Sequence, residues 1–208
     1  MERLSEYLGE VEGLVYDCEW FRIYDFIERV HGQLSRRRTN EYPEHIAQRV
    51  QEFQNSLNDF FVEEGIGWQL IAEGEIVTRG TEAFQAAVQQ AAAALEQAGR
   101  TTARGEIHEA LADLSRRPEP DLTGAVHHAM NALECVARDV AGDPKATLGD
   151  ILKRHPDLIP KPLDRAVDRA WGYASEMGRH IREGRVPQRR EVELIVGLAA
   201  TVATYLSR

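Results

Sequence analysis

The chain contains 208 residues, of which 43% are hydrophobic and 28% are charged, and its formal net charge is −9. This composition suits one or two packed globular domains and excludes a disordered tail protein. An acidic chain is also a poor candidate for a protein that coats DNA along its whole surface.

The charge is unevenly distributed along the chain. Residues 1–64 hold 14 acidic and 7 basic residues (−7), residues 65–142 hold 11 and 6 (−5), and residues 143–208 hold 9 and 12 (+3). The most apolar stretch, from Val192 to Leu206, is shorter than the roughly 18 residues that a membrane span needs. The first residues lack the pattern of a secretory signal, so we expect a cytoplasmic protein without membrane contact.

The first 78 residues predict two helices followed by a β-hairpin. Apolar residues recur every three or four positions over residues 14–35 and again over 46–61, until Gly65 and Gly67 end the pattern, so an antiparallel helix pair is expected. Two short β-favouring runs then flank the turn Glu73-Gly74 within residues 68–78. Because an isolated hairpin is marginally stable, Trp68 is expected to anchor it against the helices.

Six further helical segments follow. Thr81 is a candidate cap for a helix that ends at Gly99, and a shorter helix over residues 101–114 is closed by the prolines of residues 118–120. Helical patterns also cover residues 122–140, 147–152, 163–174 and 192–206, and residues 178–187 form a basic loop between the last two. We therefore expect a mainly α fold of about eight helices with one small β-hairpin near residues 68–78, and a central C-terminal helix.

The proline-containing joint is the expected boundary between two halves. Residues 1–117 would form an N-terminal helical module with the β-hairpin, and residues 118–208 a C-terminal helical half. One continuous domain is the alternative.

The sequence lacks the common motifs for phosphate, dinucleotide or zinc binding. His127 and His128 are adjacent, but neighbours on a helix point about 100° apart and cannot hold one ion together. Cys18 and Cys135 lie far apart and are expected to be buried apolar side chains. We therefore expect neither a metal nor a cofactor.

Positive charge is concentrated in one segment, Arg179 to Arg190. It contains five arginines and one glutamate, which gives a local charge of +4 on an acidic chain. Guanidinium groups pair with phosphate in a bidentate manner, and a nearby imidazole such as His180 is suited to acid/base catalysis. Pairing of these arginines with the protein's own carboxylates is the alternative. Tyr173 precedes the segment and could either stack on a base or pack in the core.

Several stretches of the first half resemble the N-terminal module of AbiJ-type abortive-infection proteins of bacteria. These stretches are Tyr24-Asp-Phe-Ile-Glu28, Phe53, Asn55-Ser-Leu-Asn58, Glu63-Glu-Gly-Ile-Gly-Trp-Gln-Leu70 and Gly74-Glu-Ile-Val77. The second half is similar to the segment that accompanies this module, through Ala132-Leu-Glu-Cys-Val-Ala-Arg138, Ala146-Thr-Leu-Gly149, Leu163, Trp171-Gly-Tyr-Ala-Ser-Glu176 and Arg179-His180. The resemblance implies a role in phage defence and a HEPN-like helical C-terminal half.

Ribonucleases of the HEPN superfamily use an arginine followed after four to six residues by a histidine, in a groove assembled across a dimer. This chain departs from that pattern, because the corresponding positions before His180 are Ser175, Ala174 and Tyr173. Either the site is rearranged, with Arg179, Arg182 or Arg169 acting beside His180, or catalytic activity is absent.

Three functional hypotheses follow. In the first, the chain is a metal-independent, RNA-directed defence effector in which His180 is the acid/base and Arg179 and Arg182 stabilise the phosphate charge. In the second, it is a non-enzymatic module that binds nucleic acid, a nucleotide or another defence-system protein. The third is a metal-dependent hydrolase or another small-molecule enzyme, because Asp164 and Asp168 lie one helical turn apart.

In either of the first two cases, further contacts to RNA or phosphate are expected from Arg185, Arg189, Arg190 and Tyr173. Homodimerisation is expected through the Ala-rich surface of the C-terminal helix or of residues 83–95, because small side chains allow helices to approach closely.

Overall fold

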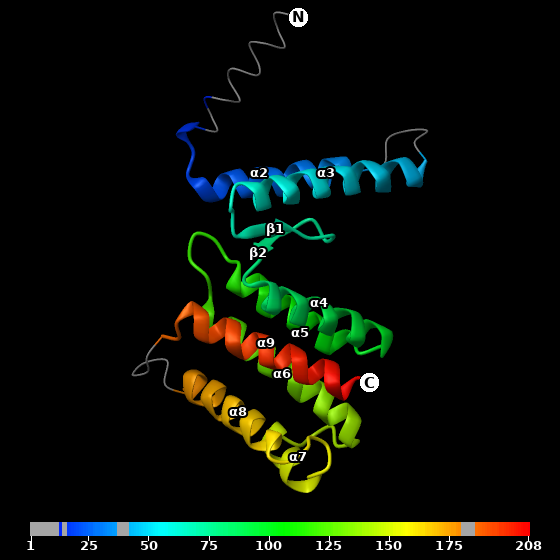
Figure 1. Ribbon diagram of the computed structural model, residues 1–208, viewed down its shortest axis with the longest axis vertical. Coiled ribbons are helices and arrows are strands. Elements are labelled where there is room, and N and C mark those ends of the chain that lie inside the picture. Colours follow the sequence, from blue (N-terminus) through cyan, green and yellow to red (C-terminus); the bar gives the residue numbers. More distant parts are fainter. Residues whose placement is uncertain (1–12, 14–15, 37–41, 180–185) are drawn as a thin grey trace, which may run out of the picture. The chain divides into compact units, whose positions relative to one another are not determined.

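The structure is a computed structural model that describes residue 13 and residues 16–36, 42–179 and 186–208 (Figure 1). Within these ranges the chain forms eight helices and one antiparallel two-stranded sheet, so the predicted mainly α fold with a small hairpin is confirmed. No helix in the described ranges has both the length and the apolar character that crossing a bilayer requires.

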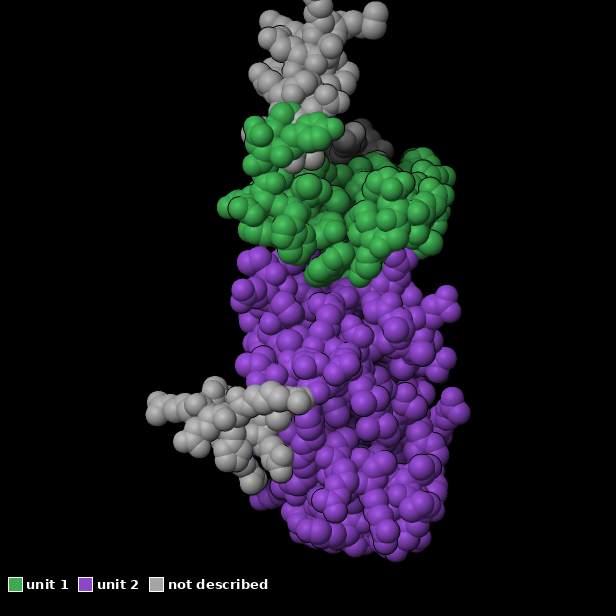
Figure 2. Space-filling view, turned by 60° about the vertical axis from the view of Figure 1, so that its left-hand side comes forward, with its two compact units in different colours: residues 1–77 green, residues 78–208 purple. Residues whose placement is uncertain are grey.

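By its internal contacts the chain forms two compact units, residues 1–77 and residues 78–208, which are coloured separately in Figure 2. The domain boundary expected after residue 117 stays a prediction.

The first unit contains helices α2 (Trp20–Leu34) and α3 (Pro43–Glu63) and the hairpin strand β1 (Trp68–Leu70), and the second strand, β2 (Ile76–Thr78), begins in it. Helices α2 and α3 are antiparallel, as predicted, because Arg49 near the start of α3 donates to the carbonyl of Leu34 at the end of α2, while Tyr24 near the start of α2 packs on Phe61 near the end of α3.

The hairpin is fixed to both helices by side chains that bond its backbone. The Asn58 side chain of α3 accepts from the Leu70 amide at 2.8 Å and donates to the Leu70 carbonyl at 2.9 Å. The Glu28 carboxylate of α2 accepts from the Ile76 amide at 2.7 Å. Trp68 is half-buried and lies 5.4 Å from the ring of Tyr24, consistent with its predicted anchoring role.

The hairpin turn requires glycine for two reasons. Gly74 has a φ of +89°, and a Cβ atom at this position would lie 2.4 Å from Nδ1 of the buried His31. A side chain would therefore be strained and would collide with the imidazole.

The second unit stacks three pairs of helices (Figure 1). The first pair is α4 (Glu82–Gln97) with α5 (Thr101–Leu114), the second is α9 (Arg189–Leu206) with α6 (Leu122–Ala141), and the third is α8 (Leu163–Arg179) with α7 (Leu148–Arg154). Helix α6 contacts α5, α7, α8 and α9, and α9 contacts α4, α5 and α6, so α6 and the C-terminal helix α9 together form the centre of this unit. Fully buried alanines at positions 125, 129, 132 and 137 of α6 permit this close packing.

Most helix ends follow the sequence signals. The side chains of Thr81, Asp121 and Thr147 each accept a hydrogen bond from the amide three residues later, and Gly142 ends α6 in the left-handed conformation. Two boundaries differ from the prediction. Pro43 is the first residue of α3, ahead of the pattern that begins at residue 46, and α8 includes Gly178 and Arg179, which were expected in the basic loop.

Candidate functional site

The predicted catalytic residues fall at the edge of what the structure describes. His180, Arg182 and Arg185 lie outside the described residues. Arg179 is the last residue of α8, and its side chain also lies outside the described part. Their proposed roles therefore stay predictions, while Tyr173, Arg189 and Arg190 can be placed.

Tyr173 connects α8 to the beginning of α9. Its hydroxyl donates to Oε2 of Glu191 at 3.3 Å, and the same oxygen accepts from the Gln188 amide at 2.8 Å within the capping box of α9. Its ring is half-buried. These contacts within the protein agree with packing of Tyr173, the alternative to stacking on a base.

Arg189 is also bound within the protein. Its Nε donates to Oε1 of Glu193 at 3.2 Å, and its Nη2 donates to the hydroxyl of Thr78. The buried Thr78 amide in turn donates to Oγ of Ser115 at 2.8 Å, and Ser115 donates to the Leu111 carbonyl at 2.6 Å. The Arg189 guanidinium thus ties α9 to Thr78, the first residue of the second unit, and through Thr78 to Ser115 at the end of α5.

Arg190 differs from its neighbour. Its side chain is exposed in the first turn of α9, and within the described ranges it has neither an ion pair nor a hydrogen bond. Arg189 therefore pairs with a carboxylate of the protein itself, which was the alternative to ligand binding, whereas Arg190 remains available to a ligand.

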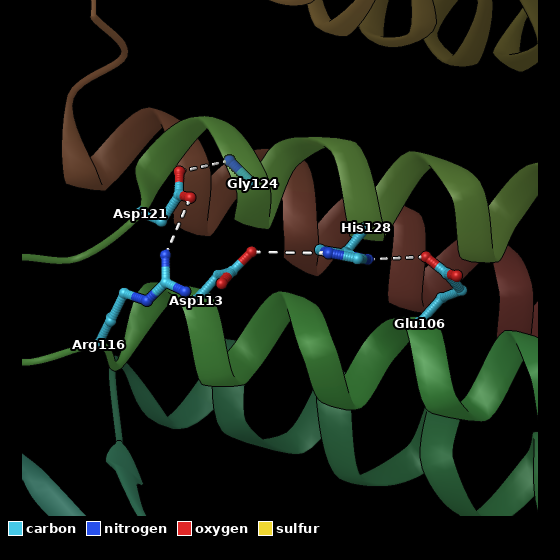
Figure 3. A network of polar contacts seen from close by, with 6 residues as sticks. All are labelled: Glu106, Asp113, Arg116, Asp121, Gly124 and His128. Atoms are coloured by element: carbon cyan, nitrogen blue, oxygen red, sulfur yellow. Dashed lines mark hydrogen bonds and ion pairs between the residues drawn. The ribbon is translucent and has the colours of Figure 1, made fainter.

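A polar network between α5 and α6 was not foreseen from the sequence. Figure 3 shows the imidazole of His128 between two carboxylates of α5, with Nδ1 2.9 Å from Oε2 of Glu106 and Nε2 3.7 Å from Oδ2 of Asp113. His127 is exposed, whereas His128 is half-buried against α5, as expected for adjacent helical residues. The signal was missed because the histidine and its two carboxylate partners belong to different helices.

The start of α6 extends this network. Oδ1 of Asp121 accepts from the Gly124 amide at 2.8 Å, and Oδ2 of Asp121 lies 3.3 Å from Nη1 of Arg116 (Figure 3). Burial raises the pKa of Asp113 above its ordinary value, and the nearby Asp121 acts in the same direction, whereas His128 and Arg116 oppose the rise.

The network is better suited to joining helices than to catalysis. Each ring nitrogen of His128 faces a carboxylate of α5, so the imidazole links α6 to two positions on α5. Asp113 belongs to α5 and Asp121 precedes α6, and the Asp121 amide donates to the Asp113 carbonyl at 2.9 Å. These contacts set the antiparallel register of α5 and α6.

The fold and these contacts define a mainly α-helical protein whose N-terminal part combines a helix pair with a β-hairpin. Residues 1–94 match the family model described as AbiJ N-terminal domain 4. The AbiJ-type resemblance is thus confirmed over this segment. The match ends within α4, and the HEPN-like character of the C-terminal half stays a prediction. No curated protein and no solved structure matches the chain.

Proposed function

We propose that this protein acts in phage defence of the abortive-infection type, and that its cationic segment binds RNA. The observation that carries the first part is the AbiJ N-terminal domain over residues 1–94. The second part is supported by the five arginines of residues 179–190 and by the exposed, unpaired position of Arg190 among the described residues.

In the enzymatic form of this proposal, His180 is the acid/base of a metal-independent, HEPN-like cleavage of RNA. Arg179 and Arg182 would stabilise the charge that develops on the phosphate during attack. A homodimer would assemble the groove from two copies of the segment, and the protein would act in the cytoplasm.

A non-enzymatic binding module is the second candidate, and one observation favours it. Arg189 is paired with Glu193 and Thr78, so part of the cationic segment serves the protein's own packing. In this form the remaining arginines hold RNA, a nucleotide or an acidic partner protein without cleaving it.

RNA cleavage and RNA binding separate these forms. Purified protein is incubated with transfer RNA and total RNA in the presence of EDTA, as wild type, His180→Ala and the control His127→Ala, which changes an exposed histidine of α6. The enzymatic form predicts cleavage that His180→Ala abolishes and His127→Ala retains. Cleavage that persists in His180→Ala refutes the role of His180.

Binding is tested with Arg190→Gln and the control Arg165→Gln, which removes the same charge from an exposed position on α8. Arg190→Gln should weaken RNA binding and reduce the slope of affinity against salt by about one counterion, and Arg165→Gln should change neither. RNA binding without cleavage supports the non-enzymatic form. The absence of any RNA binding refutes both forms of the RNA proposal.

The defence role is tested separately in bacteria challenged with phage. Cells that express the chain should give fewer plaques than cells that express a variant truncated within residues 1–94. Equal plaque counts over a panel of phages would contradict the defence role whatever the outcome with RNA.

A further inference from the structure

A second polar site lies in the C-terminal unit, at the end of the α5–α6 pair opposite the His128 network. Because α5 and α6 are antiparallel, the start of α5 lies beside the end of α6, and Arg100 accordingly pairs with Asp139 at 2.7 Å. A cavity of about 540 Å³ opens there between the α4–α5 connection, the first turn of α5 and the last turns of α6. Pockets of this size accommodate small molecules.

Two guanidinium groups line the cavity. Arg100 comes from the α4–α5 connection, and its side chain is only 18% exposed. Nε of Arg100 is bonded to Asp139, but its Nη1 is buried and has no hydrogen-bond partner within the described ranges. Nη1 is thus a donor that Asp139 does not use, although its buried position shields it from solvent.

Arg138 is the second cation of the lining. Its Nε donates to the Ala146 carbonyl at 2.8 Å, and its Nη2 pairs with Glu134 one turn earlier on α6. These two contacts hold the side chain in place beside the cavity. Of the charged residues that line the cavity, Arg100 and Arg138 are basic and Asp139 is acidic, while Glu134 pairs with Arg138 from outside the lining.

The first turn of α5 adds hydrogen-bond donors to the same wall. Thr101 and Thr102, whose hydroxyl groups and amides are donors, line the cavity. The cap residue Arg100 makes no side-chain hydrogen bond to the helix, and the first turn contains no acidic residue. The first amides of this 14-residue helix thus lack a capping side chain, and the helix dipole places partial positive charge there.

We propose that this cavity binds the phosphate group of a small phosphorylated molecule, with Arg100 and Arg138 as its cationic contacts. Guanidinium groups, threonine hydroxyls and free helix amides are the donors that recognise phosphate. The cavity is larger than a phosphate ion alone, and its lining includes the apolar side chains of Ala98, Ala103 and Pro144, which suits an attached organic group such as a nucleoside. This site shares no residue with the 179–190 segment, so it stands or falls independently of RNA binding there.

Cys135 provides a built-in reporter for occupancy. It lies in the cavity lining and is half-buried, not fully buried as the sequence suggested. Burial raises the pKa of its thiol, so it reacts slowly and a bound ligand should slow it further. Cys18, also half-buried but located in the N-terminal unit, is the internal control.

The test measures the rate at which a thiol reagent modifies each cysteine, read by mass spectrometry, at constant ionic strength. Inorganic phosphate, adenosine monophosphate and adenosine are added in separate arms. A nucleotide at ten times its Kd should slow modification of Cys135 by about tenfold and leave Cys18 unchanged. Protection by inorganic phosphate alone supports a free anion as the ligand, and stronger protection by the nucleotide supports a phosphorylated molecule.

Two kinds of variant make the assignment specific. Arg100→Gln and Arg138→Gln should each abolish protection of Cys135, while Arg165→Gln on α8 should retain it. Asp139→Asn removes the carboxylate that competes for Arg100, so it should tighten phosphate binding, and this gain is measurable even if the arginine variants fail to fold. Three results would overturn the proposal. Adenosine could protect Cys135 as well as adenosine monophosphate does, millimolar phosphate compounds could give no protection, or Asp139→Asn could bind phosphate more weakly than wild type.

Discussion

Gly124 lies at the centre of the polar network between α5 and α6, and its replacement by alanine tests that network directly. A Cβ atom at this position would lie 2.3 Å from Oδ2 of Asp113 and 2.9 Å from both Cγ and Oδ2 of Asp121. Both carboxylates would have to move, although each occupies a defined contact. The displacement of Asp121 disrupts the helix cap on the Gly124 amide and its ion pair with Arg116.

The expected magnitude follows from two opposing terms. Alanine favours a helix over glycine by up to about 1 kcal/mol. Loss of an N-cap hydrogen bond costs about 0.5–2 kcal/mol. Displacement of the half-buried Asp113 from His128 adds to the cost, so we expect Gly124→Ala to destabilise the protein by about 1 kcal/mol in total.

The matched control is Gly105→Ala, in the middle of α5. Gly105 is exposed, and a Cβ atom there meets nothing within 4 Å. This variant should gain about 0.5–1 kcal/mol, because only the helix preference acts. Denaturation in urea at pH 7 compares the free energies of unfolding. If Gly124→Ala is stabilised as much as Gly105→Ala, the carboxylate network does not constrain the start of α6 and the reasoning is refuted.

Three further predictions concern single polar contacts. Ser115→Ala should cost about 1–3 kcal/mol, measured by thermal unfolding, because the buried amide of Thr78 loses its acceptor. For Asp113→Asn, the free energy of unfolding relative to wild type should increase as the pH rises from about 4 to 7, as measured by urea denaturation. The pKa of Asp113 is raised in the folded state, so ionisation of this carboxyl destabilises the wild type as the pH rises, whereas the asparagine does not ionise. Thr147→Ala should lower the free energy of unfolding by about 1 kcal/mol, because the cap of α7 is lost. The Thr147 hydroxyl also holds the pKa of Asp150 below its ordinary value of 3.8, so an NMR titration of this variant should show that pKa closer to the ordinary value.

Each of these has an outcome that contradicts it. Ser207→Ala removes a hydroxyl that donates to the Ala203 carbonyl, and an equal loss in Ser115→Ala and Ser207→Ala would show that the Thr78 amide does not depend on Ser115. A stability difference for Asp113→Asn that stays constant with pH would contradict the effect of burial on that carboxyl. An unchanged Asp150 titration in Thr147→Ala would show that another group lowers its pKa.

Much of the fold followed from local patterns that a single segment carries. The helix expected over residues 122–140 is found at Leu122–Ala141, and Thr81 caps α4 as predicted. These features were predictable because helical periodicity and capping depend on residues within one or two turns of each other.

The boundaries and the polar sites were less accessible to such reasoning. The apolar pattern begins only at residue 46, yet α3 begins at Pro43, because proline fits the first turn of a helix, where its missing N–H has no partner to lose. The contacts of His128 with Glu106 and Asp113, and the cavity beside Arg100 and Arg138, each join residues of separate helices. No spacing within the sequence reports such tertiary neighbours, and the principal residues of the predicted site lie outside the described ranges.

The position of α9 has a consequence for how the protein is made. Helix α9 covers α4 and α6, although about 50 residues or more separate it from both in the chain. During translation, α4 and α6 emerge from the ribosome well before residues 189–206 have been added. Their apolar faces stay uncovered over that interval, so nascent chains are expected to need chaperone protection until α9 arrives.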